Sequence, residues 1–496
     1  MSFLSLHFAA MVAVLFVLYY KLPKRFQPVL LLTGSLYFYY CCSGLLLFVM
    51  AGTSFAAFCC GKYLYHNRHK TSPKSSAVHH TGQKLICGFA VLLLLSPLIL
   101  LKYSGFLLRA FSNSQGLTGQ LLSCFLSIGL PIGISFYTLQ LIAYIMDIYR
   151  GKYAPENNFF RFLLFTSFFP QILQGPIPRF DVLKESLFTS HDFEEKTVTA
   201  GLMKLICGLF LKLMIADKAA LFVDAVFNTE EHFAGAIYLT AGILYSFQLY
   251  ADFFSCVLLA QGIALLFGIR LAENFAQPYF ATSIKDFWRR WHISLSSWLR
   301  DYIYIPLGGN RKGALRTDFN LLATFLVSGI WHGSGFKYLF WGMMHGGFQI
   351  AGKYTLSIRN RFFSAIKFPT HIRQVLQQVV TFFLVMTAWI IFRANSLRDG
   401  LSALYSVVFD FRLSSLFISF ESFGLSLPEL VVLLLSLVIL YLYDYFAEHG
   451  KPLTESLTAL HPVKQFTAAL ILLLLIAVFG TYGFGYDANA FIYGGF

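Results

Sequence analysis

The sequence predicts an all-α polytopic membrane protein with about 11 transmembrane helices and a few re-entrant or interfacial helices. Its composition supports this fold class. Of the 496 residues, 57% are hydrophobic, 18% are aromatic and only 12% are charged, which is about half the charged fraction of a typical soluble domain. The apolar residues also gather in long runs, and a helix needs roughly 20 of them to cross a bilayer.

The apolar runs, in chain order, are the candidate helices. They comprise residues 3–20, 28–44, 45–61, 84–101, 121–148, 159–173, 199–216, 235–267, 315–330, 338–351, 375–391, 428–445 and 465–482. Several are too short to cross alone, and we expect re-entrant or paired half-helices there, with ends covered by protein or water. The run 3–20 lacks a basic leading region and a small-residue cleavage site, so we interpret it as the first span.

The distribution of Lys and Arg predicts the orientation, because cytoplasmic loops are enriched in both. Basic clusters lie at residues 21–25, 62–84 and 353–373. We expect all three to be cytoplasmic, which places the N-terminus and the tail 483–496 outside. Residues 66–83 are polar and are expected to form a mobile loop. We interpret the pair His79-His80 in that loop as solvated residues, with a metal ligand pair as the alternative.

Charge and cysteine content exclude two other classes of function. The net charge of +14 does not indicate nucleic-acid binding, since the basic residues occupy short loops between apolar runs. None of the eight cysteines has metal-ligand spacing with histidine, so no metal site is expected. We interpret them as small buried residues, with S-acylation of Cys59 or Cys60 as the alternative. Without any evident repeat or soluble domain, residues 1–496 are expected to form one integral-membrane domain.

The first polar motif occupies residues 285–302. Two stripes recur at helical spacing: an apolar one of Trp288, Trp291, Leu295, Trp298 and Tyr302, and a polar one of Lys285, Arg289, His292 and Ser296. The segment is too charged to cross the bilayer, so it is expected to be one interfacial or re-entrant amphipathic helix. The alternative is an anchor helix on the cytoplasmic surface, with its tryptophans among the lipid headgroups.

A glycine-rich basic turn follows at residues 302–313. Its backbone N–H groups, with Arg311 and Lys312, are suited to binding phosphate groups. It is not a P-loop, because the Gly-Lys-Ser/Thr ending is missing.

The second polar motif, residues 329–346, lies in an apolar stretch. His332 follows Trp331 and is flanked by glycines, which let another backbone or a ligand come close. A neutral imidazole there is able to take a proton from a hydroxyl group, and such general-base help is worth about 10²–10⁴-fold in rate. The alternative is a histidine bonded to a carbonyl of a neighbouring helix. His345 fits that alternative better, because the sequence offers it no partner.

These residues resemble a known family. The run from Asn274 to Arg311, which contains Phe287-Trp-Arg-Arg-Trp-His292, is similar to the membrane-bound O-acyltransferase family. Within that family the chain resembles the bacterial branch of the alginate O-acetyltransferase membrane subunit, with the D-alanyl transferase of teichoic acid synthesis as the neighbouring branch. Supporting runs are residues 133–140, 147–151, 169–179 and 491–493. The likeness spans most of residues 130–350, the expected catalytic core.

The resemblance implies a mechanism and a location. Two family histidines lie in a funnel or tunnel that joins the two faces of the membrane. Carried over, His332 is the catalytic histidine and His292 the second functional one, which positions the thioester. Acetyl-CoA or another acyl-CoA serves as the cytoplasmic donor, with no bound cofactor. The acceptor is a secreted or cell-envelope polysaccharide, served by a periplasmic or extracellular acetyltransferase partner, and the chain lies in the lipid of the bacterial inner membrane.

Further polar residues suit the lining of such a tunnel. Tyr137, Gln140, Tyr144 and Asp147 recur at 3-4-3 spacing on one helical face. Asp252, Arg289, Ser296 and Trp331 complete the set of expected lining residues. Hydrogen bonding between helices is the alternative interpretation for the residues of the 137–147 face and for Asp252.

The chain departs from the family pattern at residues 252–258, where a glycine, a serine and a second aspartate are absent, and at its Gly-Gly-Phe496 ending. Three hypotheses therefore compete: an acyltransferase, a transporter or lipid flippase, and an inactive scaffold that recruits another enzyme. A transporter would show discontinuous helices in two matching halves, and no such repeat is evident. The presence of both His292 and His332 argues against the scaffold.

Overall fold

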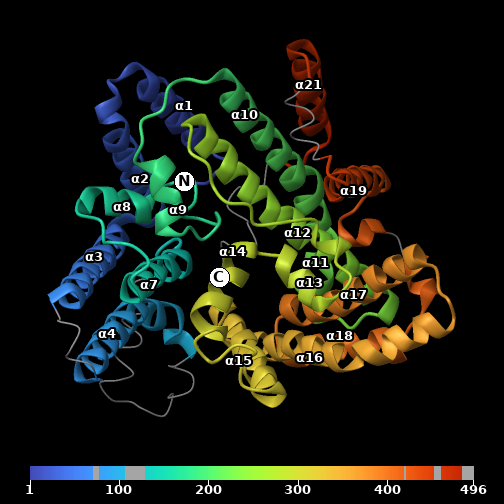
Figure 1. Ribbon diagram of the computed structural model, residues 1–496. Coiled ribbons are helices and arrows are strands. Elements are labelled where there is room, and N and C mark those ends of the chain that lie inside the picture. The colour runs from blue at the N-terminus through green and yellow to red at the C-terminus, as the bar shows by residue number, and fades with distance from the viewer. Residues whose placement is uncertain (71–76, 107–128, 418–419, 452–459, 483–496) are drawn as a thin grey trace, which may run out of the picture. The chain divides into compact units, whose positions relative to one another are not determined.

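The computed structural model describes residues 1–70, 77–106, 129–417, 420–451 and 460–482, and every regular element in these ranges is a helix (Figure 1). The chain divides into two compact units. The first unit holds Met1–Gly201 and Ala260–Ala272, and the second holds Leu202–Leu259 and the described chain from Glu273 onward. The helical class predicted from the sequence is confirmed for this part of the chain.

The first unit is built around α7, which packs against α3 and α4, while α8 packs against α2 and α3 (Figure 1). Nearly every residue of α7 is buried, because other helices cover it on several sides. The elements are α1 (Leu6–Lys21), η1 (Lys24–Phe26), α2 (Gln27–Ser43), η2 (Gly44–Leu46), α3 (Leu47–Lys70), α4 (Ala77–Lys102), α7 (Ile134–Arg150), α8 (Phe159–Ser167) and α9 (Phe180–Leu187).

The second unit contains the helices that carry both polar motifs. Its elements are α10 (Glu195–Phe210, which begins in the first unit), η3 (Leu211–Ala216), α11 (Asp217–Phe227), α12 (Gly235–Leu266, which ends in the first unit), η4 (Pro278–Phe280), α13 (Ile284–Arg290), α14 (Ile293–Leu299), η5 (Arg300–Tyr304), α15 (Ala314–His332), α16 (Phe336–Ala365), α17 (Thr370–Arg393), α18 (Leu397–Phe409), η6 (Leu413–Phe417), η7 (Phe420–Phe423), α19 (Leu427–Glu448) and α21 (Pro462–Phe479). Of these, η3 and η5 are π-helices.

Two glycines let α15 and α16 form a tight hairpin. A Cβ atom on Gly329 would collide with the backbone carbonyl of Tyr338, and one on Gly342 would collide with that of Phe325. Small residues at such positions allow helix backbones to approach closely. The hairpin carries His332 at the end of α15 and His345 in α16, so this close approach sets the spacing between the two helices that hold them.

Among the described residues, seven helical stretches are long and apolar enough to cross a membrane, as expected of a multi-pass membrane protein. They are Lys24–Arg68, Gly82–Lys102, Glu195–Phe227, Gly235–Leu266, Thr370–Arg393, Leu427–Glu448 and Pro462–Phe479. The first contains two helices, α2 and α3, which are separated at Gly44, where the backbone has a left-handed φ of 55°. The total of about 11 crossings stays a prediction.

The predicted mobile loop over residues 66–83 is largely wrong. Helix α3 continues to Lys70 and α4 begins at Ala77, and only residues 71–76 between them lie outside the described chain. The stretch from Lys62 to Lys70 contains no glycine or proline, so no residue in it interrupts the helical hydrogen bonds. Elsewhere, α8 has nine residues and is too short to cross. The tail 483–496 and residues 121–128 also lie outside the described chain.

Candidate functional site

The predicted single helix over residues 285–302 is wrong, because the chain turns sharply at His292. Helix α13 ends at Arg290, α14 begins at Ile293, and His292 between them has a left-handed φ of 45°. Few residues other than glycine adopt this conformation. It is held by two backbone bonds to a distant segment: the N–H of Ala276 donates to the carbonyl of Arg290, and the N–H of Ile293 donates to that of Asn274, each at 3.0 Å.

Asn274 also fixes the protonation pattern of the His292 ring. Its Oδ1 accepts hydrogen bonds from the backbone N–H of Ser294 (3.0 Å) and from the Ser294 hydroxyl (2.9 Å). A backbone N–H only donates, so this atom is the amide oxygen, and the Nδ1 of His292 at 3.3 Å must donate to it. Burial lowers the pKa of His292 to about 3, so the ring is neutral at physiological pH and carries its lone pair on Nε2.

The surface-anchor alternative for this motif is also wrong. Trp288, Trp291 and Trp298 are all buried inside the protein, whereas an anchor would place them among lipid headgroups. Trp288 and Trp291 belong to the aromatic core of the second unit, and Trp291 lies 5.2 Å from Trp389, measured between ring centroids. The polar stripe is divided as well, since Lys285 and Arg289 are exposed while His292 is buried.

His332 ends α15 and is 3% exposed. Its ring is surrounded by aromatic rings: the centroid distances are 4.8 Å to Trp331, 5.1 Å to Trp341 and 5.4 Å to Phe392. Trp331 in turn lies 6.0 Å from His292. The structure therefore brings the histidines of the two motifs close to one tryptophan.

His345 is completely buried, and its partner comes from the first motif. The indole N–H of Trp288 donates to the Nδ1 of His345 at 3.2 Å. The bonded residues are 57 positions apart in the chain, which explains why periodicity within either motif did not reveal the pair. The ring of His345 also lies 4.8 Å from that of Trp341. Together these rings form an aromatic array, which runs in the order His292, Trp331, His332, Trp341, His345 and Trp288.

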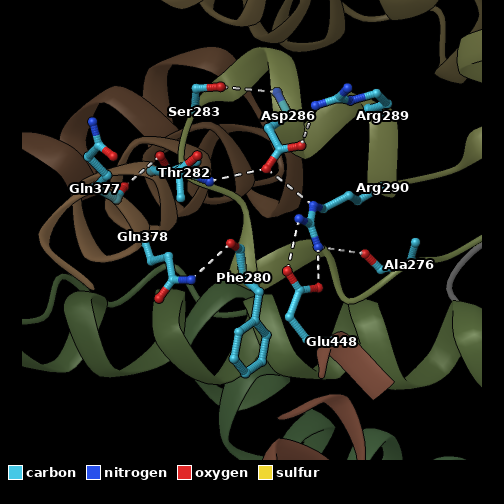
Figure 2. Close-up of polar contacts among 11 residues, drawn as sticks. Ala276, Phe280, Thr282, Ser283, Asp286, Arg289, Arg290, Gln377, Gln378 and Glu448 are labelled. Carbon is cyan, nitrogen blue, oxygen red and sulfur yellow. Dashed lines mark hydrogen bonds and ion pairs between the residues drawn. The ribbon is translucent and has the colours of Figure 1, made fainter. Parts of the chain in front are cut away.

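Arg290 ties the first motif to the rest of the second unit (Figure 2). Its guanidinium makes a two-pronged ion pair with Glu448 at the end of α19, at 2.5 and 3.1 Å, and also bonds to Asp286 at 3.2 Å. It further donates to the carbonyl of Ala276 at 3.4 Å. Arg289 bonds only to Asp286 in Figure 2, and its side chain is 78% exposed. The polar stripe of the motif predicted Arg289 as a tunnel residue and gave no sign of Arg290, whose partner is 158 positions away.

Asp252 takes part in a buried charge cluster. Its charged partners in that cluster were not predicted from the sequence. Lys212, in the π-helix η3, bonds to Asp252 of α12 at 2.7 Å and to Asp217 of α11 at 2.8 Å. The side chains of Lys212 and Asp252 are 2% and 1% exposed. Buried charges at membrane depth are costly unless they are paired, and this pairing supports the interpretation of Asp252 as a residue that bonds between helices.

The remaining predicted residues lie as follows. The Ser296 hydroxyl donates to the carbonyl of Trp291 at 3.2 Å. Arg311 and Lys312 are exposed on the turn after η5. Tyr137, Gln140, Tyr144 and Asp147 are buried in α7 of the first unit. Gln140 donates to the carbonyl of Phe165 at 2.7 Å, and Asp147 pairs with Lys152 at 3.5 Å. These contacts agree with bonding between segments, and a tunnel-lining role for these residues stays a prediction.

The chain is similar to several known proteins. A family model described as MBOAT, membrane-bound O-acyltransferase family, matches residues 155–395. A probable alginate O-acetylase of Pseudomonas putida is 35% identical over 476 residues, which cover 93% of each chain. A peptidoglycan O-acetyltransferase of Helicobacter pylori is 37% identical over 306 residues, covering 56% of this chain and 57% of its own. A teichoic acid D-alanyltransferase of Bacillus subtilis is 30% identical over 228 residues, covering 43% and 56%.

Proposed function

Since the chain belongs to the membrane-bound O-acyltransferase family and is therefore an O-acyltransferase, we propose that it passes an acetyl or similar short acyl group from cytoplasmic acyl-CoA to an acceptor outside the membrane. CoA remains in the cytoplasm throughout. The observation that carries this proposal is the aromatic array, which joins the histidine of each motif in one buried cluster.

His332 is the general base in this proposal. The acceptor hydroxyl loses its proton to the imidazole as its oxygen attacks the thioester carbonyl. The carbon–sulfur bond then breaks, and the CoA thiolate takes the proton back from His332. Base catalysis of this kind contributes about 10²–10⁴-fold in rate. The rings of Trp331, Trp341 and Phe392 surround this imidazole and keep bulk water away from it.

His292 holds the donor. Its Nδ1 is engaged by Asn274, so the neutral ring offers a lone pair at Nε2. A lone pair accepts a hydrogen bond, which suits an amide N–H of the CoA arm. Arg311 and Lys312 on the exposed turn are suited to the phosphates of the same donor. In this arrangement the basic turn is cytoplasmic, and a funnel lined by Ser296 and Trp331 of the second unit leads to the array. We expect about 11 crossings in total.

The acceptor we propose is a polysaccharide of the cell envelope or a secreted one, in a bacterial inner membrane. The support is that relatives are named for O-acetylation of alginate and of peptidoglycan. We also propose an extracytoplasmic acetyltransferase partner that receives the acyl group. The altered residues 252–258 lie on α12 and begin at Asp252, which pairs with Lys212 of η3, so they are the first place to look for a difference in acceptor.

An acetyl-transfer assay with radiolabelled acetyl-CoA tests this function. Purified protein in proteoliposomes, with oligosaccharide acceptor on the far side, is expected to transfer label, and His332→Ala is expected to reduce the rate by about 10²-fold or more. His292→Ala is expected to lower turnover without loss of membrane insertion. The exposed His371→Ala serves as the matched control. Undiminished transfer by His332→Ala contradicts the catalytic assignment, and passage of unmodified donor across the bilayer supports a transporter instead.

A further inference from the structure

Two buried N–H donors lie one turn apart on α16, beside the proposed base. Trp341 and His345 are both completely buried. Because the Nδ1 of His345 accepts a bond from Trp288, the neutral ring carries its hydrogen on Nε2. Within the described chain, neither this Nε2–H nor the indole N–H of Trp341 has a hydrogen-bond partner. Native proteins rarely leave buried donors unsatisfied, so a pair of them on one helix indicates a bound acceptor group.

The position of these donors matches the needs of acyl transfer. The Trp341 ring lies close to both histidines, 5.1 Å from His332 and 4.8 Å from His345, measured between ring centroids. When a hydroxyl attacks a thioester, the carbonyl oxygen gains negative charge. N–H groups fixed in a water-free site stabilise that charge, and one such donor is worth about 10²–10³-fold in turnover.

Resting on the function proposed above, we propose that the Nε2–H of His345 and the Nε1–H of Trp341 bind the carbonyl oxygen of the acyl thioester. They stabilise the negative charge on that oxygen while His332 takes the proton of the acceptor. His345 and Trp341 are therefore further catalytic residues. Trp288 is a positioning residue, because its N–H holds the hydrogen of His345 on the nitrogen that faces away from Trp288.

This assignment separates the roles of the three histidines. A neutral imidazole that donates a hydrogen bond polarises a carbonyl without changing its own protonation state. Substitution of His345 should therefore lower kcat and leave the pH dependence of kcat/KM unchanged, because the base is His332. A residue that only packed the core would affect folding without changing the electronic state of a bound carbonyl.

The test is the infrared spectrum of the carbonyl group of ¹³C-labelled acetyl-CoA bound to the full-length protein. The His332→Ala background keeps the thioester intact. There, we expect the carbonyl band to lie at lower frequency than in free acetyl-CoA. Adding His345→Phe, which removes the donor, is expected to return the band toward its free position, whereas His345→Gln, which keeps an N–H, retains most of the shift. In the active protein His345→Phe should lower kcat by about 10²–10³-fold.

One further variant keeps the outcome decisive. Trp341→Phe preserves the ring but removes its N–H, and it decides the question if His345→Phe fails to yield monodisperse protein. An unchanged carbonyl band and an unchanged kcat in both variants overturn this inference even if His332→Ala is inactive. Full activity of His332→Ala overturns the proposed base instead, so the two failures are distinguishable.

Discussion

At the scale of single residues, hydrogen-bond partners place the ring hydrogen on different nitrogens in two histidines of the array. It lies on Nδ1 in His292 and on Nε2 in His345. Asn274 accepts from the Nδ1 of His292, whereas Trp288 donates to the Nδ1 of His345. One neutral ring therefore offers a lone pair at Nε2, and the other offers an N–H there. Both partners are uncharged, so they select a tautomer without favouring the charged imidazolium form.

Replacing the amide of Asn274 with a carboxylate tests the role of a neutral His292. In Asn274→Asp the negative charge favours the imidazolium form, so the pKa of His292 should rise from about 3 toward or above its ordinary value of about 6.5. The lone pair is then lost as pH falls through that new pKa and recovered as pH rises. Turnover should accordingly gain an acidic limb near neutral pH, measured as the pH profile of kcat.

Ser294→Ala is the control for this experiment, because it removes one bond to the same amide oxygen and adds no charge. Its pH profile should match that of the unmodified protein. The role of a neutral His292 is contradicted if Asn274→Asp folds and shows the unmodified profile too.

At the scale of elements, periodicity predicted where helices occur and missed where they bend. The candidate spans at 315–330, 375–391 and 428–445 are confirmed as helices α15, α17 and α19 within a few residues. The stripe over 285–302 has good helical spacing, yet the chain breaks at His292 because residues 274–276 bond to the backbone there. Helical spacing reports contacts three or four positions apart, whereas the bend depends on a separate segment.

The ion pair between Arg290 and Glu448 should be the main polar connection between α13 and α19. Removing one partner of a hydrogen-bonded charge pair typically costs about 1.5–3 kcal/mol. We therefore expect Arg290→Gln to lower the thermal unfolding temperature in detergent and to reduce turnover, because the bend at His292 loses its anchor. The adjacent Arg289→Gln removes an exposed pair, worth about 0–1 kcal/mol, and should change neither property by much.

These neighbouring substitutions form a matched comparison, since residue type and chemical change are the same. Equal unfolding temperatures for the two variants would show that the contact with Glu448 does not stabilise the motif.

At the scale of the whole molecule, composition and motif were enough to identify the class and family. The all-helical class is confirmed over the part of the chain that the structure describes, and the membrane-bound O-acyltransferase family is confirmed as well. The contacts of the site could not be predicted in the same way. The pairs Trp288–His345, Lys212–Asp252 and Arg290–Glu448 join residues 57, 40 and 158 positions apart. Such pairs depend on how helices pack, and a single sequence contains no record of that packing.

The predicted orientation is testable by cysteine labelling in intact cells. In a background without native cysteines, His66→Cys near the end of α3 should resist a membrane-impermeant maleimide, because that basic region is expected to be cytoplasmic. Arg412→Cys, between α17 and α19, should react readily from outside. Both side chains are exposed, so access to the protein surface does not bias the comparison. Reaction at position 66 with protection at position 412 would reverse the orientation.

The glycine contacts of the α15–α16 hairpin limit which acyl groups the site has room for. Backbone atoms meet at Gly329 and Gly342, so main-chain contact fixes the separation of these two helices, and trimming a side chain would not widen it. Room for a longer fatty tail must therefore come from walls other than this hairpin. Replacing large residues on α17 or α12 with smaller ones is the rational route to a change in the length of acyl chain that the protein accepts.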